Sequence, residues 1–401
     1  MKFTVPHNWQ HDLIPGIREL RVEELYAKLP SDFVGGGRAS YTLPRVSKKR
    51  VARIVSDAHK RGIRFNYLLN ATCLGNREWT IKGQRRLLGL LDWLAEVSVD
   101  AVTVSIPYLM EVVKKRYPRL SVCVSTQAGV NTIRKAKHWE ELGADRITLA
   151  EISVNRNFPL LRRMRQALKC ELQLIANLDC LYECPFSIYH SVLNSHGSQD
   201  GGGFLFDYCT LACNYIRLKD PVEFIRAGWI RPEDVRYYED AGIDSIKLVN
   251  RTMTTGAIIL AVEAYTKGRY DGNLLDLFSR PSKSIVFQRA GILHKFRYFF
   301  RPFSVNILAL LKARSLLGEI KVHIDNRSLD GFIEHFLGES CDLRSCDDCG
   351  YCSDVAKRSI RISPAWHEKA AANYKKCLDT LLSGDMFSYS RYIFDKKKGQ
   401  A

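Results

Sequence analysis

Eight short runs of β-branched and other apolar residues recur along the first 250 residues of the chain. They read KFTVPHN, ELYAKLP, RFNYLLN, AVTVSIP, LSVCVST, RITLAE, ELQLIAN and SIKLVN. Segments of helical period separate most of them, for example residues 47–62, 82–97 and 130–143. Alternating strands and helices predict parallel pairing through right-handed crossovers. Eight such units predict a closed (β/α)8 barrel of the TIM type.

A doubly wound open sheet is the alternative, because the second unit is irregular. Residues 24–46 carry three successive glycines at 35–37, which we interpret as a flexible connection at the barrel mouth. No G-x-G-x-x-G motif follows the first strand, so the usual dinucleotide-binding fingerprint is missing. This absence favours the barrel over the open sheet.

The length of 401 residues exceeds what a single barrel of roughly 250 residues needs. We expect a catalytic barrel at 1–270, with a cysteine-bearing insertion at 180–231 after the seventh strand. A basic, amphipathic and cysteine-rich extension is expected at 271–401. Because neither a secretory signal nor a run of about 18 apolar residues is found, a cytoplasmic location is expected, with peripheral membrane association as a variant.

The twelve cysteines are unevenly spaced, which in a reducing compartment favours metal ligation over disulfides. The insertion carries two C-x3-C pairs, Cys180, Cys184, Cys209 and Cys213. Four thiolates suit either tetrahedral zinc or an iron-sulfur cluster. Since structural zinc usually prefers the tighter C-x2-C spacing, a 4Fe-4S cluster is favoured here.

A second group occupies the C-terminal extension in a C-x4-C-x2-C-x2-C arrangement, namely Cys341, Cys346, Cys349 and Cys352. Successive two-residue spacings let a short loop wrap a cubane, and the same residues could build a zinc knuckle. A second 4Fe-4S cluster and a zinc ion are equally compatible with this pattern.

Polar residues stand where the predicted strands end, which in a barrel is the reactive face. Glu151 is the candidate acid or base, and His7 is an alternative proton carrier. The candidate substrate-binding residues are Asn70, Ser125, Thr126, Gln127, Asn177 and Arg251. Their convergence at equivalent strand ends is what points to a site.

Two segments, VSTQAGVNTIRKAKHWEELGADRITLAEIS at 124–153 and IRPEDVRYYEDAGIDSIKLVNR at 230–251, resemble the U-32 peptidase family. The resemblance implies a possible 4Fe-4S cluster on four cysteines, since members include oxygen-independent hydroxylases of this kind. Their substrates are ubiquinone precursors, transfer RNA or ribosomal RNA, with prephenate as an implied hydroxyl source. By this resemblance the four insertion cysteines would be the ligands, and Glu151 would match the family's glutamate.

The chain also departs from that family. Ala150 stands where the family usually has arginine, and the customary surroundings of its cysteines are not recognisable in DCLYEC and YCTLAC. The substrate therefore does not transfer from any one member, and the second cysteine group is an addition.

We accordingly expect an iron-sulfur-dependent, oxygen-independent hydroxylase or redox enzyme acting on a quinone-like, lipid or RNA substrate. A U-32-type peptidase is one alternative, although G-x-S-x-G and H-E-x-x-H are absent and the histidines show no recognisable pairing with serine or cysteine. A cluster-bearing electron carrier or scaffold for a partner enzyme is the other.

The formal net charge of +17 favours contact with polyanions or anionic surfaces. The segment 280–314 interleaves basic with aromatic and aliphatic residues and contains no acidic side chain. It would suit RNA or an anionic membrane, and a structural cover packed on the barrel is the alternative. A protein partner or electron donor is also expected, and the oligomeric state is left open.

Overall fold

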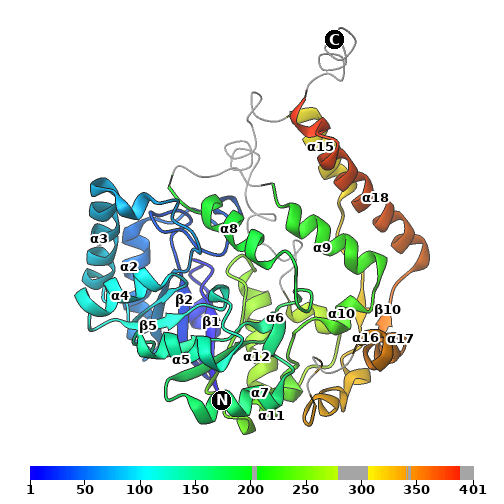
Figure 1. The fold of residues 1–401 in the computed structure, drawn as a ribbon, viewed down its shortest axis with the longest axis horizontal. Coiled ribbons are helices and arrows are strands. Elements are labelled where there is room, and N and C mark those ends of the chain that lie inside the picture. The colour runs from blue at the N-terminus through cyan, green and yellow to red at the C-terminus, as the bar shows by residue number, and fades with distance from the viewer. Residues whose placement is uncertain (201–205, 279–305, 340, 342–344, 389–401) are drawn as a thin grey trace.

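In the computed structural model, which describes residues 1–200, 206–278, 306–339, 341 and 345–388, eight parallel strands close into a barrel (Figure 1). They are β1 (Lys2–Pro6), β2 (Val22–Ala27), β3 (Arg64–Leu69), β4 (Ala101–Val104), β5 (Ser121–Val124), β6 (Arg146–Thr148), β7 (Glu171–Ile175) and β8 (Ser245–Lys247). The predicted barrel is confirmed. The open sheet is wrong because β8 pairs with β1, with Ser245 opposite Lys2.

Helices surround the barrel and alternate with its strands. They are α1 (Leu13–Gly16), α2 (Lys48–His59), α3 (Ile81–Glu96), α4 (Pro107–Arg116), α5 (Ile133–Glu141), α6 (Glu151–Val154), α7 (Phe158–Ala167), α11 (Val235–Asp240) and α12 (Thr255–Lys267). The three predicted helical segments correspond to α2, α3 and α5. Each begins after a side-chain cap, because the Ser47, Thr80 and Thr132 hydroxyls accept a backbone N–H of the first turn.

The barrel interior is filled by polar and charged side chains rather than by aliphatic ones. Arg146 Nη1 lies 2.8 Å from Glu24 Oε1, and Arg146 Nε lies 2.8 Å from Glu171 Oε2. Asn66 donates to the same Glu24 oxygen at 3.2 Å. Lys247 Nζ stands 4.2 Å from the centre of the Tyr26 ring. Alternate strand residues face outward, where they form the apolar core between strands and helices.

The insertion after β7 is largely helical in its described part. It contains α8 (Ser187–Gly197), α9 (Tyr208–Lys219) and α10 (Glu223–Arg226). In Figure 1, α8 and the start of α9 lie at the end of the barrel opposite the N-terminus, where the strands terminate. The insertion therefore covers the carboxyl ends of the strands, the usual reactive face of such barrels.

The C-terminal region packs on the barrel and on the insertion. Its regular elements are α15 (Ile307–Leu316), β9 (His323–Ile324), α16 (Cys346–Cys349), α17 (Tyr351–Ser359), β10 (Ile360–Arg361) and α18 (Pro364–Leu382). Short 3-10 helices are η1 (Ser40–Thr42), η2 (Arg77–Trp79), η3 (Thr126–Ala128), η4 (Pro232–Asp234), η5 (Leu274–Leu277), η7 (Arg327–Leu329), η8 (Phe332–Phe336) and η10 (Asp385–Phe387). Figure 1 shows α18 running alongside α9, with α15 beside its far end. Apolar residues of η5, η8 and α17 belong to the same cluster as the barrel core, and the domain boundary at residue 270 stays a prediction.

Most of the basic segment 280–314 lies outside the described residues, so its predicted roles stay predictions. Among the described helices, none is long and apolar enough to cross a membrane.

Candidate active site at the barrel mouth

Asn70, Ser125 and Gln127 meet at the carboxyl ends of β3 and β5. The Asn70 amide donates to Ser125 Oγ at 3.3 Å, and Ser125 Oγ also accepts the Gln127 backbone N–H at 3.2 Å. Asn70 Oδ1 and Gln127 Oε1 are buried and have no hydrogen-bond partner within the described part of the chain. An unsatisfied buried acceptor costs free energy, so both oxygens are suited to receive a donor from a bound substrate.

The glycine triplet at 35–37 forms the opposite wall of this space. All three glycines are buried, which corrects the expectation of a flexible connection. A Cβ at Gly36 would stand 2.7 Å from Asn70 Oδ1, and one at Gly37 would collide with the Gln127 amide. Glycine is required here because the backbone passes directly over these two side chains.

Glu151 begins α6 and is 8% exposed. Burial raises the pKa of its carboxyl group, while Thr126 Oγ1, which contacts Glu151 Oε2, opposes the rise. Thr126 also donates to Leu149 O at 2.9 Å and is thereby held in place. A buried carboxyl with a raised pKa can hold a proton nearer neutral pH and release it, which is what acid–base chemistry needs.

His7 does not share this environment. The imidazole is fully buried in the loop after β1, and Nδ1 accepts the Trp9 backbone N–H at 3.0 Å. Burial, reinforced by Arg50, lowers the pKa of His7 to about 3. The ring is therefore neutral at pH 7, and its environment does not favour the proton-carrying role expected from the sequence.

The contacts of Asn177 indicate a structural role. Its amide donates to Val249 O and, at 2.9 Å, to Leu277 O, while its Oδ1 accepts the Val249 N–H at 2.7 Å. The side chain therefore ties the end of β7 to the end of β8, which leaves little of it for a substrate.

Arg251, by contrast, is 3% exposed, and its Nη1 lacks a hydrogen-bond partner among the described residues. Burial lowers its pKa to about 10, and at neutral pH the guanidinium remains a buried cation available to an anionic group.

Lys28 and Asp32 were not among the predicted residues, yet they organise the loop beside the site. Lys28 Nζ is fully buried, 2.9 Å from Asp32 Oδ2, and Tyr67 donates to the same oxygen at 2.8 Å. Asp32 Oδ1 accepts the Gly35 N–H at 2.7 Å, which fixes the start of the glycine triplet. A sequence signal for Lys28 was available, since alternate strand residues face the same side and Lys28 continues the inward-facing series of Glu24 and Tyr26 beyond the strand.

The loop that carries Cys180 and Cys184 is tied to the helix of Glu151. The Glu183 N–H donates to Ile152 O at 2.9 Å. Burial raises the pKa of the Cys180 thiol well above its usual value, and the neighbouring Glu151 carboxylate raises it further. The structure thus brings the first cysteine pair next to the candidate acid.

Cys209 and Cys213 lie on one face of α9, one turn apart, and Arg217 follows one turn later. Arg217 Nη1 lies 3.6 Å from Cys213 Sγ, and its Nη2 donates to Asp179 O, so this buried cation links α9 to the first pair. Burial raises the pKa of Cys209 to about 12 and that of Cys213 to about 11. Arg217 is a site residue that the sequence did not single out.

The first cysteine group shares one buried cation in part, because Arg217 acts electrostatically on Cys180, Cys184 and Cys213. The charges of Cys180, Cys184 and Cys209 each influence, or are influenced by, that of Cys213. Within the described ranges, however, no three His, Cys, Asp or Glu side chains are arranged so that they could hold a metal ion. Raised thiol pKa values mean that metal binding here would release protons.

The second cysteine group lies beside α10, because α17 packs on α10 and Arg226 of α10 acts electrostatically on Cys352. Burial raises the pKa of Cys341 to about 11, and the buried Arg156 opposes this effect there and at Cys352. Cys349 Sγ lies 3.8 Å from His335 Nε2, a cysteine–histidine pairing that the sequence did not reveal. The His335 ring stacks on Tyr351 at 3.9 Å between centroids.

Comparisons with known proteins found the following similarities. The sequence profile of peptidase family U32 matches residues 34–176. A Methanocaldococcus jannaschii protein named uncharacterized protease MJ1657 is 32% identical over 339 residues, which cover 84% of this chain and 89% of that protein. The tRNA hydroxylation protein P1 of Bacillus subtilis is 23% identical over 217 residues, about half of each chain. The solved structure of the U32 peptidase Mk0906 is 26% identical, covers 62% of this chain and 91% of that one, and has a TM-score of 0.47.

Proposed function

This chain belongs to peptidase family U32, and from that premise we propose that it is an iron-sulfur enzyme that hydroxylates its substrate without molecular oxygen. The observation that carries the proposal is the placement of Cys180 beside Glu151 at the barrel mouth, with Cys213 and Arg217 joined to the same loop. The name of the Bacillus subtilis relative supports it, since that protein is named for tRNA hydroxylation.

Cys180, Cys184, Cys209 and Cys213 would hold a 4Fe-4S cluster, which when bound supplies one-electron transfer. Arg217 would offset part of the negative charge of four thiolates in a buried setting. The second cysteine group would hold either a further cluster or zinc. Arg156 would offset its thiolate charge there, as Arg217 would at the first group.

The residues of the mouth would bind and orient the reactants. Asn70 Oδ1 and Gln127 Oε1 would accept hydrogen bonds from the substrate, and Arg251 would pair with an anionic group. A hydroxylated donor, for which prephenate is the candidate, would pass its hydroxyl group to a substrate C–H position and take the hydrogen in exchange. Atoms and electrons then balance without oxygen, and Glu151 would hold the proton that moves.

The test is a mass-spectrometric comparison of anaerobically grown cells that carry the wild-type protein or Glu151→Gln in place of the natural copy. We expect a quinone or RNA nucleoside heavier by one oxygen atom in wild-type cells, and its loss in the variant with iron and sulfide retained in the purified protein. Glu141→Gln, the same change at an exposed position of α5, serves as the control. Equal product in wild type and Glu151→Gln would remove Glu151 from the chemistry, and no oxygen-bearing product in wild-type cells would contradict the proposal.

Proteolysis is the second candidate because the Methanocaldococcus jannaschii relative is named a protease. The pairing of Cys349 with His335 is the feature that could serve it, although this pair is exposed on the second cysteine group. If the chain is a peptidase of this type, Cys349→Ala will abolish cleavage of casein by the purified protein. Our proposal expects no cleavage by the wild type.

A further inference from the structure

A basic groove lies on the outside of the barrel, and none of the mouth residues that define the candidate active site lines it. It occupies about 920 Å³ between α1 and α2. The residues that line it are Gln10, His11, Ile14, Pro15, Arg18, Arg50, Arg53, Ile54, Asp57, Lys60 and Arg61. We propose that this groove binds the phosphate backbone of a single-stranded nucleic acid.

The charge of the groove is one-sided. Five guanidinium or ammonium groups line the groove with a single carboxylate, Asp57, which already accepts a bond from Lys60 at 3.1 Å. Outside the lining, the exposed Glu19 pairs with Arg18 at 3.4 Å. Neither Arg53 nor Arg61 has an ion-pair partner among the described residues, and both are exposed. Crowded like charges repel one another, and a polyanion relieves that repulsion while releasing its own counterions.

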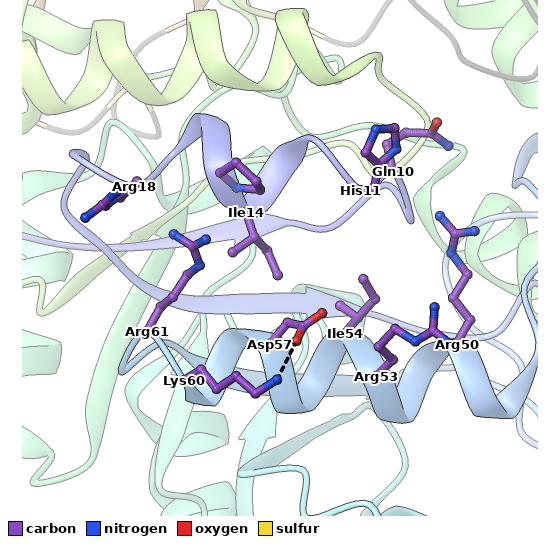
Figure 2. Close-up of a pocket in the computed structure, with 11 residues that line it drawn as sticks. Gln10, His11, Ile14, Arg18, Arg50, Arg53, Ile54, Asp57, Lys60 and Arg61 are labelled. Atoms are coloured by element: carbon purple, nitrogen blue, oxygen red, sulfur yellow. Dashed lines mark hydrogen bonds and ion pairs between the residues drawn. The ribbon is translucent and has the colours of Figure 1, made fainter.

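The cations are distributed along the groove rather than gathered at one point. Figure 2 shows Arg50 and Arg53 near one end, beside Gln10 and His11, and Arg18 and Arg61 near the other. Arg50 and Lys60, at the start and the end of α2, are roughly 15 Å apart at 1.5 Å rise per residue. This span suits several successive phosphates of one strand better than a single phosphate group.

The residues that line the groove also favour a nucleic acid over a membrane surface as its ligand. Its aliphatic residues Ile14 and Ile54 are 4% and 6% exposed, and Pro15 is the one exposed apolar side chain of the lining, which is too little for insertion into a bilayer. No Phe, Tyr or Trp ring lines the groove, and the imidazole of His11 at one end is the single ring there on which a base could stack. Contact would therefore be with the backbone and independent of base sequence.

One end of the groove borders the barrel mouth. Arg50 Nη2 donates to Trp9 O at 2.6 Å, in the loop that follows β1. A strand held in the groove would therefore pass close to the end of the barrel where the strands terminate. The inference itself concerns binding and does not depend on the proposed hydroxylation.

The test measures fluorescence anisotropy of a labelled RNA of about twelve nucleotides with the full-length protein, from low to high salt. Arg53→Gln with Arg61→Gln should weaken binding about tenfold at 0.15 M salt and reduce the slope of log affinity against log salt by about 1.4. Lys49→Gln with Arg85→Gln is the matched control, since it removes the same charge from exposed positions outside the groove. It should change the affinity by less than about twofold.

DNA of the same sequence should bind like RNA, because backbone contacts do not read the bases. Equal weakening in both double variants would show that net charge alone is responsible and would overturn the inference. So would unchanged affinity in Arg53→Gln with Arg61→Gln, or wild-type protein that binds phosphatidylserine vesicles but not RNA.

Discussion

At the scale of single residues, the mouth of the barrel is defined by polar groups that the fold leaves without protein partners. Among the described residues, three such atoms are buried without a hydrogen-bond partner, namely Asn70 Oδ1, Gln127 Oε1 and Arg251 Nη1. Glu151 is buried with a raised pKa. Such groups are costly to stability, and they cluster where a ligand can satisfy them. The same criterion sets Asn177 apart, because its amide is already used by the backbone.

The raised pKa of Glu151 makes stability depend on pH in a known direction. The folded chain binds this proton more tightly than the unfolded chain, whose carboxyl has the ordinary value of 4.5. The contribution is present below pH 4.5 and is lost as pH rises through the folded pKa. Glu151→Gln keeps the shape without the ionisation, so its free energy of unfolding relative to the wild type should increase from pH 4.5 upward. Urea unfolding at several pH values checks this, and a difference that does not change with pH would contradict it.

At the scale of elements, α9 connects the cysteine site to the C-terminal region. Leu211 and Leu218 of α9 belong to one apolar cluster with Leu378 of α18, and His367 Nε2 lies 2.5 Å from Leu218 O. The opposite face of α9 presents Cys213 and Arg217 toward the loop of Asp179. The position of α9, and with it half of the proposed ligand set, therefore depends on α18.

Leu378→Ala should destabilise the protein by about 2–5 kcal/mol, because this side chain is 8% exposed and its removal leaves a cavity against α9. It should also reduce the iron retained after anaerobic purification, since α9 loses its support. Leu382→Ala is the matched control on the same helix, where the side chain is 71% exposed. Iron content that is the same in the two variants would argue against support of α9 by α18.

Sequence reasoning located the elements better than their contacts. The strands were predictable because each apolar run is short and stands alone between polar turns, and α2, α3 and α5 because their apolar period is clear. Arg217 was not predictable as a site residue, since its partner Asp179 lies in a loop whose course no local pattern specifies. For Lys28, four residues before its partner Asp32, the alternation of the strand was an available signal. The cysteine groups were found by spacing alone, but spacing cannot tell whether buried, protonated thiols will give up their protons to a metal.

At the scale of the whole molecule, the barrel interior contains buried ion pairs, and the mouth of the barrel is lined by polar side chains. Glu24 and Arg146 are both buried in the barrel interior, where Asn66 also donates to Glu24 Oε1 and Glu171 also pairs with Arg146. A buried ion pair of this kind contributes little net stability, yet the loss of one partner leaves an unpaired charge inside. The polar interior thus makes the correct closure of the barrel dependent on a few charged residues.

Arg146→Met should lower the free energy of unfolding by about 3–5 kcal/mol, because Glu24 would remain buried without its cation. Adding Glu24→Gln to this variant should recover part of the loss, as expected for coupled partners. Chemical denaturation of the two single variants and the double variant measures the coupling. Strictly additive losses would show that the pair does not act as a unit.

The central claim is that the first cysteine group holds an iron-sulfur cluster. It is tested most directly by iron, zinc and acid-labile sulfide content after anaerobic purification. Cys209→Ala with Cys213→Ala should lose iron and sulfide, whereas Cys346→Ala with Cys349→Ala should keep the content due to the first group, and Cys170→Ala should match the wild type. Zinc without sulfide in the wild type, or unchanged iron and sulfide in Cys209→Ala with Cys213→Ala, would contradict the account.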